Sequence, residues 1–268
     1  MTRIVVHAGF HKTGTSSLQD YLRHHRAALR ERAAIYLKED FPEVGYATRA
    51  FGFRPSLWRR WRFRRALRAF LAGLPDDDQI FLSWEGFSGI MPGHRRPLTG
   101  LVSGYDRAAV PLAKITRDEL RRRFGPRAQI VFLYTLRRRE SWLRSVWGHV
   151  VRSIQIRHDM SEFLEMMKDT PSLEEEAATL ARALAPTPVE TAWLEDLTPL
   201  PQGPAAAALR LIGLSEAEIA ALPPARRTNI GNPPALSEAF LALNREISDK
   251  AELKRRKDAL LHSRTPHE

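Results

Sequence analysis

Nine consecutive residues near the start of the chain combine a lysine, four hydroxyl side chains and two glycines. These residues, 9–17 (GFHKTGTSS), follow a short apolar run at residues 4–6 and precede a helix-like pattern. A loop between a strand and a helix presents backbone N–H groups and the positive end of the helix to an anion. Gly14 allows a close approach, and the donor side chains are those of Lys12, Thr13, Thr15, Ser16 and Ser17. Residues 9–17, called the phosphate loop below, therefore predict a phosphate site rather than an ordinary glycine-containing turn.

The position of the lysine in this loop is unusual. In the common nucleotide-triphosphate loop, GxxxxGK[ST], the lysine directly follows the second glycine. Gly9 and Gly14 keep the spacing of that pattern, but Thr15 occupies the lysine position and the lysine stands at position 12. The displacement changes which phosphate-like group the ammonium can reach. It therefore argues against ATP and for a different transfer reaction.

A second group of anion-binding side chains follows the apolar run at residues 130–136. Arg137 comes directly after the run, and Ser145 lies eight residues later, on the first turns of the next expected helix. A guanidinium at the end of a strand can hold a phosphate through two parallel N–H bonds. The two side chains predict a second anion site, with the alternative that the arginine is solvated and the serine has no special role.

The elements that position these residues can be read from the spacing of apolar residues. Continuous apolar runs at residues 4–6, 80–83 and 130–136 predict strands that are buried on both faces of a parallel sheet. Helical patterns separate them, and a short charged helix at residues 116–124 ends at Gly125. Strands alternating with helices predict an α/β fold of the P-loop type, with three layers, a central parallel sheet and ligands at the carboxyl ends of its strands.

The second half of the chain is mainly helical by the same criteria. We expect residues 1–268 to form a single domain, in which residues 47–111 are less regular and residues 250–268 form a charged, frayed tail. The helices predicted in the second half span residues 161–168, 173–184, 205–212 and 236–261.

At residues 11–19 (HKTGTSSLQ) the chain resembles the 5′-phosphosulfate loop of sulfotransferases that use 3′-phosphoadenosine-5′-phosphosulfate (PAPS), especially bacterial and carbohydrate-type members. Arg137 and Ser145 resemble the 3′-phosphate motif of that family, and the two motifs stand in the family's order and separation. A late segment with Arg227 resembles the part of the family whose basic residue returns to the 3′-phosphate. Weaker similarities lie at residues 195–197 and 209–214.

This resemblance implies a sulfuryl transfer from PAPS, with 3′-phosphoadenosine-5′-phosphate (PAP) as the product. Lys12 would contact the bridging oxygen between the 5′-phosphate and the sulfuryl group and stabilise charge as that bond breaks. The sulfuryl group carries less charge than a terminal phosphoryl group, so no metal ion is expected. The resemblance also implies that residues 40–110 hold an acceptor-binding insertion.

The acceptor hydroxyl needs a base within hydrogen-bonding reach. Glu85 follows the expected strand at residues 79–83 and would lie beside the phosphate loop. Carbohydrate sulfotransferases use a glutamate near this point, whereas many small-molecule members use a histidine. Glu85 is therefore the expected base; alternatively it caps a helix or pairs with an arginine, and His11, His94 and His149 are rivals.

A basic segment interleaves arginines with aromatic residues. Residues 59–65 (RRWRFRR) follow Trp58, and an apolar pattern continues beyond them. Such a helix can lie on an acidic membrane or hold an anionic acceptor, because its cations face outward. The alternative, which we favour from the sequence, is a solvated amphipathic helix that packs Trp58, Trp61 and Phe63 on the core.

Composition narrows the classes of function. The formal net charge of +11 favours anionic partners. The chain has no cysteine, which excludes disulfides, thiolate zinc sites and cysteine nucleophiles. We expect no nucleic-acid partner, because no known binding motif accompanies the charge. The start of the chain has no signal-peptide pattern, and no apolar run approaches the ~20 residues that cross a bilayer, so we expect a cytoplasmic protein.

The leading hypothesis is a cytoplasmic PAPS-dependent sulfotransferase whose acceptor is a hydroxyl of a small molecule, saccharide or glycolipid. In this hypothesis Glu85 is the base, and Arg137, Ser145 and Arg227 hold the 3′-phosphate. Two alternatives stay open: a P-loop kinase that uses ATP and magnesium, and a non-catalytic binder of acidic membranes or glycans.

Overall fold

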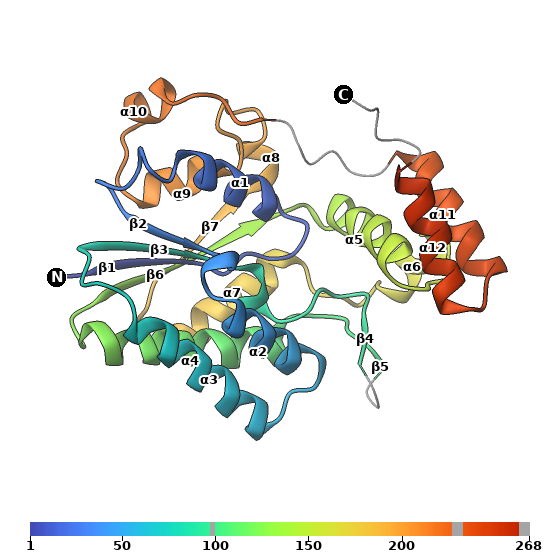
Figure 1. Ribbon diagram of the computed structural model, residues 1–268, viewed down its shortest axis with the longest axis horizontal. Helices are drawn as coiled ribbons and strands as arrows, with labels where there is room; N and C mark the ends of the chain where they lie inside the picture. The colour runs from blue at the N-terminus through green and yellow to red at the C-terminus, as the bar shows by residue number, and fades with distance from the viewer. Residues whose placement is uncertain (97–99, 227–232, 263–268) are drawn as a thin grey trace. The chain divides into compact units, whose positions relative to one another are not determined.

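The computed structural model describes residues 1–96, 100–226 and 233–262 (Figure 1). Its chain divides into two compact units. The first unit contains Met1–Arg139 and Pro171–Asn229, and the second contains Glu140–Thr170 and Ile230–Glu268.

A five-stranded parallel sheet forms the centre of the first unit, in the order β2-β3-β1-β6-β7. The central strand β1 pairs with β3 on one side and β6 on the other, so that Ile4 is opposite both Ile80 and Ile130. The strands are β1 (Arg3–His7), β2 (Ala34–Leu37), β3 (Gln79–Ser83), β6 (Gln129–Leu136) and β7 (Val189–Trp193). Since all five are parallel, the carboxyl ends of β1, β3 and β6 meet at one edge of the sheet.

Helices cover both faces of this sheet and complete three layers (Figure 1). One face carries α1 (Thr15–His25), α8 (Leu194–Leu197), α9 (Ala205–Leu211) and α10 (Glu216–Ala221). The other carries α2 (Pro42–Phe53), α3 (Leu57–Ala72), α4 (Asp106–Phe124) and α7 (Leu173–Leu184). Short elements complete the unit: the 3₁₀ helices η1 (Lys38–Asp40) and η2 (Glu85–Ser88), and a two-stranded ribbon of β4 (Arg95–Arg96) and β5 (Gly100–Leu101). The predicted α/β, P-loop-like fold is therefore confirmed.

Apolar packing explains why α1 lies where it does. Val5, Phe81 and Leu133 project from three neighbouring strands into one buried cluster. Leu18 and Leu22 of α1, spaced one helical turn apart, are fully buried in the same cluster. This packing fixes the start of α1, and with it the phosphate loop, at the carboxyl end of β1.

The second unit is helical and contains α5 (Arg139–Ser153), α6 (Met160–Met166), α11 (Pro234–Glu246) and α12 (Lys250–His262). Only the first residue of α5 belongs to the first unit. The Lys257 ammonium of α12 donates to the carbonyls of Val151, Arg152 and Ile154, at 2.8, 3.0 and 3.0 Å. A cation at a helix C-terminus meets carbonyls that lack partners within the helix, so this lysine ties α12 to the end of α5.

Several sequence predictions are confirmed and others are wrong. The three predicted strands and the helix at residues 173–184 are present. The helix predicted at 116–124 begins ten residues earlier, at Asp106, and runs through Pro111. The helix predicted at 236–261 is two helices, and residues 250–262 do not fray, because Leu253 and Lys257 of α12 are buried.

The sequence analysis also missed β2, β7 and α2, and α2 extends into the region expected to be irregular. Within the described ranges, no helix combines the length and the apolar character needed to cross a membrane.

Candidate functional site

The phosphate loop joins β1 to α1 through an unusual backbone path. Gly9, Lys12 and Gly14 have positive φ angles of 47°, 69° and 88°. Among the described residues, Lys12 is the one non-glycine residue in this left-handed region. A non-glycine residue loses roughly 1–2 kcal/mol there, and such strain concentrates at functional sites. The strained backbone of Lys12 is therefore a second feature, besides its position in the sequence, that is typical of a functional residue.

Two of the four hydroxyl groups in the loop hold its shape. Thr13 donates from Oγ1 to the carbonyl of Phe10 at 2.6 Å and lies 2.7 Å from Oγ1 of Thr135 on β6. The Thr15 hydroxyl donates to the same Phe10 carbonyl at 3.3 Å. Both threonines are buried, whereas Ser16 is exposed and Ser17 is half-buried. The threonine hydroxyls thus serve the loop itself, and the serines lie nearer to solvent.

The N-terminus of α1 is left open by its own sequence. Gly14 is the N-cap residue and supplies no side-chain cap, and the first turn contains no acidic residue. The first N–H groups of a helix have no partners within the helix, and its dipole is positive at this end. A Cβ at Gly14 would come within 2.8 Å of the side chains of Leu194 and Pro204. The glycine is therefore required by packing as well as by its φ angle.

Arg137 lies directly against the phosphate loop. The residue follows β6, and its Nη1 donates to the carbonyl of Lys12 at 3.2 Å across 125 positions of sequence. Burial lowers the pKa of the Arg137 guanidinium, and the nearby Glu195 carboxylate opposes that effect. Glu195, on α8, also accepts a hydrogen bond from the backbone N–H of Arg138 at 3.0 Å. The two cationic residues predicted from separate motifs, Lys12 and Arg137, are thus brought together.

Glu85 lies at the same edge of the sheet and is connected to α1. It begins η2, one residue after Trp84, whose backbone N–H donates to the carbonyl of His7 at the end of β1. Gln19 of α1 donates from Nε2 to Glu85 Oε2 at 3.2 Å. The same amide lies 3.2 Å from the Ser83 hydroxyl. Gln19 therefore holds the expected base at a fixed place relative to the phosphate loop.

Behind Gln19 lies a buried polar pair. His7 Nδ1 is 2.8 Å from the Ser83 hydroxyl, and both side chains are fully buried. Burial lowers the pKa of His7 to about 3, so the imidazole is neutral at physiological pH. The Ser83 hydroxyl of this pair accepts a hydrogen bond from the Gln19 amide, and the pair is uncharged.

Of the three rival histidines, His11 is the one at this edge. Its backbone N–H donates to the Tyr105 hydroxyl at 3.1 Å, and its Nδ1 is 3.2 Å from the same oxygen. Burial raises the pKa of Tyr105 well above its ordinary value, and the Glu85 carboxylate adds to that shift. His94 instead packs edge-on against Phe53, and His149 is on α5 in the second unit.

The predicted site residues divide into three groups. The phosphate loop, Arg137 and Glu85 lie together in the first unit. Ser145 belongs to the second unit, and Arg227 is outside the described residues, so both stay predictions from the sequence. Sequence reasoning missed Gln19, although it lies one helical turn after Thr15 and so on the same side of α1. It also missed Ser83 and Thr135, whose contacts depend on strand pairing.

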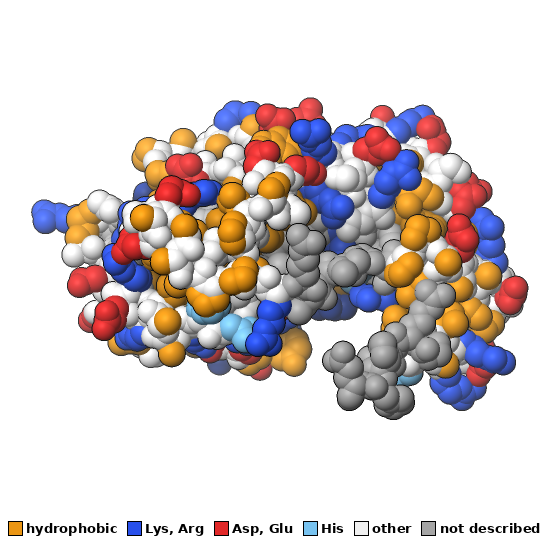
Figure 2. Space-filling view, turned by 90° about the horizontal axis from the view of Figure 1, so that it is seen from above, with side chains coloured by type: hydrophobic (Ala, Val, Ile, Leu, Met, Phe, Trp, Pro, Cys, Tyr) orange, Lys and Arg blue, Asp and Glu red, His pale blue; other side chains and the backbone are white. Residues whose placement is uncertain are grey.

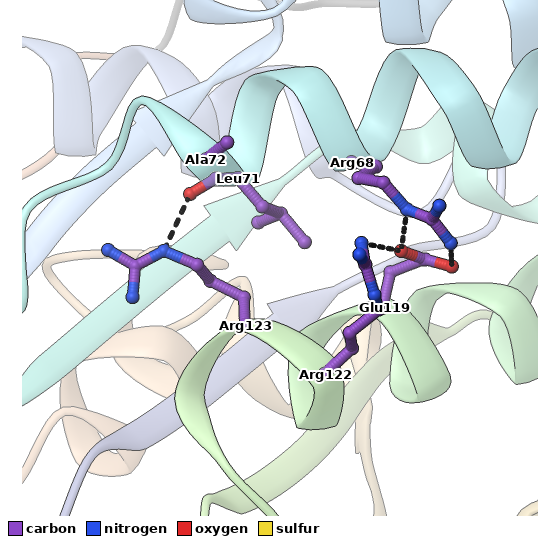
Figure 3. A pocket seen from close by; sticks show the side chains of 6 residues that line it. All are labelled: Arg68, Leu71, Ala72, Glu119, Arg122 and Arg123. Carbon is purple, nitrogen blue, oxygen red and sulfur yellow. Dashed lines mark hydrogen bonds and ion pairs between the residues drawn. The ribbon is translucent and has the colours of Figure 1, made fainter.

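One cavity in the first unit lies apart from these residues. Its volume is about 240 Å³, and it is lined by Arg68, Leu71, Ala72, Glu119, Arg122 and Arg123 (Figure 3). Its polar groups bond within α3, α4 and the segment after α3, since Arg123 donates to the carbonyls of Leu71 and Leu74 and pairs with Asp76. The cavity contains no residue of the phosphate loop.

No family model matches the chain, and no curated protein matches it. In the described part of the chain, no group of three or more His, Asp or Glu side chains is placed to hold a metal ion.

Proposed function

We propose that the protein is a PAPS-dependent sulfotransferase that moves a sulfuryl group to an acceptor hydroxyl. The observation that carries this proposal is the contact of the Arg137 guanidinium with the Lys12 carbonyl at 3.2 Å. It joins the loop that resembles a 5′-phosphosulfate site to the arginine that resembles a 3′-phosphate site. A single nucleotide with phosphates at both positions is the ligand that both resemblances share.

The proposed reaction is an in-line transfer. The bond between the sulfur and the bridging oxygen of PAPS breaks, a bond forms between the sulfur and the acceptor oxygen, and the acceptor proton passes to Glu85. Negative charge grows on the bridging oxygen as it leaves with PAP. In this proposal the Lys12 ammonium and the N-terminus of α1, which has no side-chain cap of its own, stabilise that charge, and preorganised donors of this kind are a large part of catalysis.

Glu85 acts as a general base in this proposal. Gln19 holds one of its carboxylate oxygens at 3.2 Å, which leaves the carboxylate oriented by α1. His11 is at the same edge but is engaged with the Tyr105 hydroxyl through both its backbone N–H and its ring. These contacts favour the glutamate as the base. The carbohydrate-type members that the loop resembles use a glutamate as well, and this resemblance supports a saccharide or glycolipid hydroxyl as the acceptor.

Arg137 would bind the 3′-phosphate, together with Ser145 and Arg227 as the sequence predicts. A half-buried guanidinium is a strong phosphate donor because it remains charged and presents a rigid fork of N–H groups. The proposal requires no metal ion, because the transferred sulfuryl group has little charge to neutralise.

Calorimetric titration with PAP tests the proposal directly. We expect binding by the wild-type protein that does not change when EDTA is added. Lys12→Ala and Arg137→Ala should each weaken binding at least about 10-fold, since a hydrogen bond to a charged group contributes about 1.5–3 kcal/mol. Lys114→Ala and Arg182→Ala are the matched controls, because both side chains are exposed, on α4 and α7.

Three results would overturn the assignment. They are no binding of PAP by the wild type, unchanged binding in both variants of the site, or binding of ATP that requires magnesium. The last result would favour the kinase. PAP binding without transfer to any small-molecule, saccharide or glycolipid hydroxyl would instead leave a nucleotide-binding protein that is not a sulfotransferase.

A further inference from the structure

The first turns of α3 expose large apolar side chains. Leu57, Trp58 and Trp61 are 80%, 63% and 46% exposed. Phe63, Leu67 and Leu71 of the same helix are almost completely buried. The prediction that the aromatic residues of this segment pack on the core is therefore correct for Phe63 and wrong for the two tryptophans. Spacing explains the difference, because residues 63, 67 and 71 form one helical stripe and residues 58 and 61 lie off it.

The exposed tryptophans are ordered by each other and by an arginine. The rings of Trp58 and Trp61 stack with their centroids 4.7 Å apart and an interplanar angle of 18°. The Arg65 guanidinium lies 5.6 Å from the centroid of the Trp61 ring. Positions 58, 61 and 65 follow the three- and four-residue spacing of one helix face. The result is a continuous strip of aromatic and cationic groups on the side of α3 that faces away from its buried stripe.

The arginines of α3 serve two different purposes. Arg64 and Arg68 pair with Glu119 of α4, at 3.4 and 2.8 Å, and the Glu119 side chain is only 5% exposed. Figure 3 shows the Arg68 fork on this carboxylate. These inward arginines connect α3 to α4.

The outward arginines are different. Arg62 and Arg65, each four residues after a tryptophan of this strip, are exposed, and in the described part of the chain neither forms an ion pair with a carboxylate. The helix itself contains no acidic residue. Within the described residues, therefore, no carboxylate pairs with these positive charges.

The opposite face of the first unit shows that this is not a general property of the surface. Figure 2 looks onto the side that carries α1 and α9, where acidic and basic side chains are interspersed. There Arg32 pairs with Glu218, and Arg210 pairs with Glu216 at 2.6 Å. Charge on that face is compensated locally, whereas the outward charge of α3 is not.

We propose that the tryptophan–arginine face, made of Leu57, Trp58, Trp61, Arg62 and Arg65, docks on an anionic lipid bilayer. Indole rings favour the interface between lipid headgroups and acyl chains, because they are apolar with one polar N–H. The negative surface potential of anionic lipids attracts the arginines that lie beside these rings. A helix with these two features lies in the plane of the interface.

Leu57 decides between lipid and a soluble polyanion. An acidic glycan or a free phosphate can use the arginines and stack on the tryptophans, but it gains nothing from an aliphatic side chain that is 80% exposed at the helix start. A bilayer interface buries that side chain together with the rings. The surface therefore fits an anionic membrane, and this inference does not depend on the proposed sulfuryl transfer.

Sedimentation with sucrose-loaded vesicles tests the inference on the full chain. We expect binding to vesicles of phosphatidylcholine mixed with phosphatidylserine, little binding to phosphatidylcholine alone, and weaker binding as salt is raised. Arg62→Gln and Arg65→Gln combined should lower the partition coefficient about 25-fold, because each arginine near the surface contributes roughly fivefold. Trp58→Ser with Trp61→Ser should lower it about tenfold through lost apolar burial.

The matched control changes the same net charge on the opposite face. Arg32→Gln and Arg210→Gln combined remove two arginines that are paired with carboxylates around α1 and α9. This control should bind vesicles as the wild type does. Melting temperatures and PAP titrations of all variants show whether each is folded and separate this result from the proposed function.

Two outcomes would overturn the inference. One is equal loss of vesicle binding in the control and the α3 variants, which would mean attraction by net charge alone. The other is loss in the arginine variant with no change in the tryptophan variant and parallel loss of heparin retention, which would assign the face to a soluble polyanion.

Discussion

Two helices of the first unit, α1 and α7, begin in opposite ways. The start of α7 is closed by its own residues: Ser172 accepts from the Glu175 backbone N–H, and the Glu175 carboxylate accepts from the Ser172 backbone N–H at 2.7 Å. Its first turn carries three glutamates. The start of α1 has a glycine cap, no side-chain cap and no acidic residue.

This difference indicates the function of the N-terminus of α1. In both helices the first N–H groups have no partner within the helix, and the dipole is positive at that end. At α7 the protein neutralises them, whereas at α1 it adds the cations Lys12 and Arg137. The carboxylate tied to α1, Glu85, is held by Gln19 in the second turn instead of by the first N–H groups. An arrangement of this kind favours an external anion.

The largest effect is expected from Glu85→Gln. Removing the base should lower the rate of sulfuryl transfer roughly 10³-fold, within the usual range for a general base. The Gln19 amide can still contact the new side chain, so PAP binding should be retained. Transfer from PAPS is measured alongside a PAP titration, with the exposed Glu174→Gln of α7 as the control. A variant with wild-type transfer would exclude Glu85 as the base.

The next effect makes the start of α1 resemble that of α7. Ser16→Glu places a carboxylate in the exposed first turn of α1. It should stabilise the helix by about 0.3–1 kcal/mol through the dipole, yet weaken PAP binding about 100-fold by repelling the 5′-phosphate. A protein that is more stable but binds PAP more weakly would show that the substitution blocks the ligand site and does not damage the fold. Ser16→Ala, which removes only the hydroxyl, is the control. If Ser16→Glu bound PAP as the wild type does, the anion could not lie at the start of α1.

Much of this site could be predicted because its residues are adjacent in sequence or end a buried strand. The phosphate loop follows β1, Glu85 follows β3 and Arg137 follows β6, and the middle of each strand is a run of apolar residues. Parallel pairing then brings their carboxyl ends together. The supporting contacts could not be predicted in this way. Thr135 meets Thr13 only because β6 pairs with β1.

Elements were missed where burial is partial or polar. β7 lies at an edge of the sheet and exposes Glu190, so its apolar signal is weak. In α12 one of the two buried residues is Lys257, which the sequence presents as a solvated charge. Its three carbonyl partners belong to a segment some hundred positions earlier, as the separations of 106, 105 and 103 residues indicate. A buried cation therefore holds α12 in place, and the pattern of apolar residues in the sequence does not reveal such a contact.

A third prediction concerns the packing of the α1 start. Gly14→Ala should destabilise the protein by roughly 2–3 kcal/mol, because alanine is strained at a φ of 88° and its Cβ would meet Leu194 and Pro204. Gly213→Ala is the matched control, since its φ is 84° but nothing lies within 4 Å of the added atom. The control should cost only about 1–2 kcal/mol. Chemical denaturation measures both, and equal losses would show that packing against α8 does not constrain the loop.

The smallest effect is expected at α7. Ser172→Ala should reduce the free energy of unfolding by about 1 kcal/mol through loss of the cap, with PAP binding unchanged.

The cap of α7 also predicts how stability depends on pH. Hydrogen bonds from the Ser172 backbone and hydroxyl lower the pKa of Glu175 in the folded protein. The stability that they provide is present above the unfolded pKa of that carboxyl and is lost as pH falls through the folded value. The difference in unfolding free energy between wild type and Glu175→Gln should therefore shrink on acidification. If Ser172→Ala weakened PAP binding as much as Ser16→Glu does, the contrast between the two helix starts would lose its functional meaning.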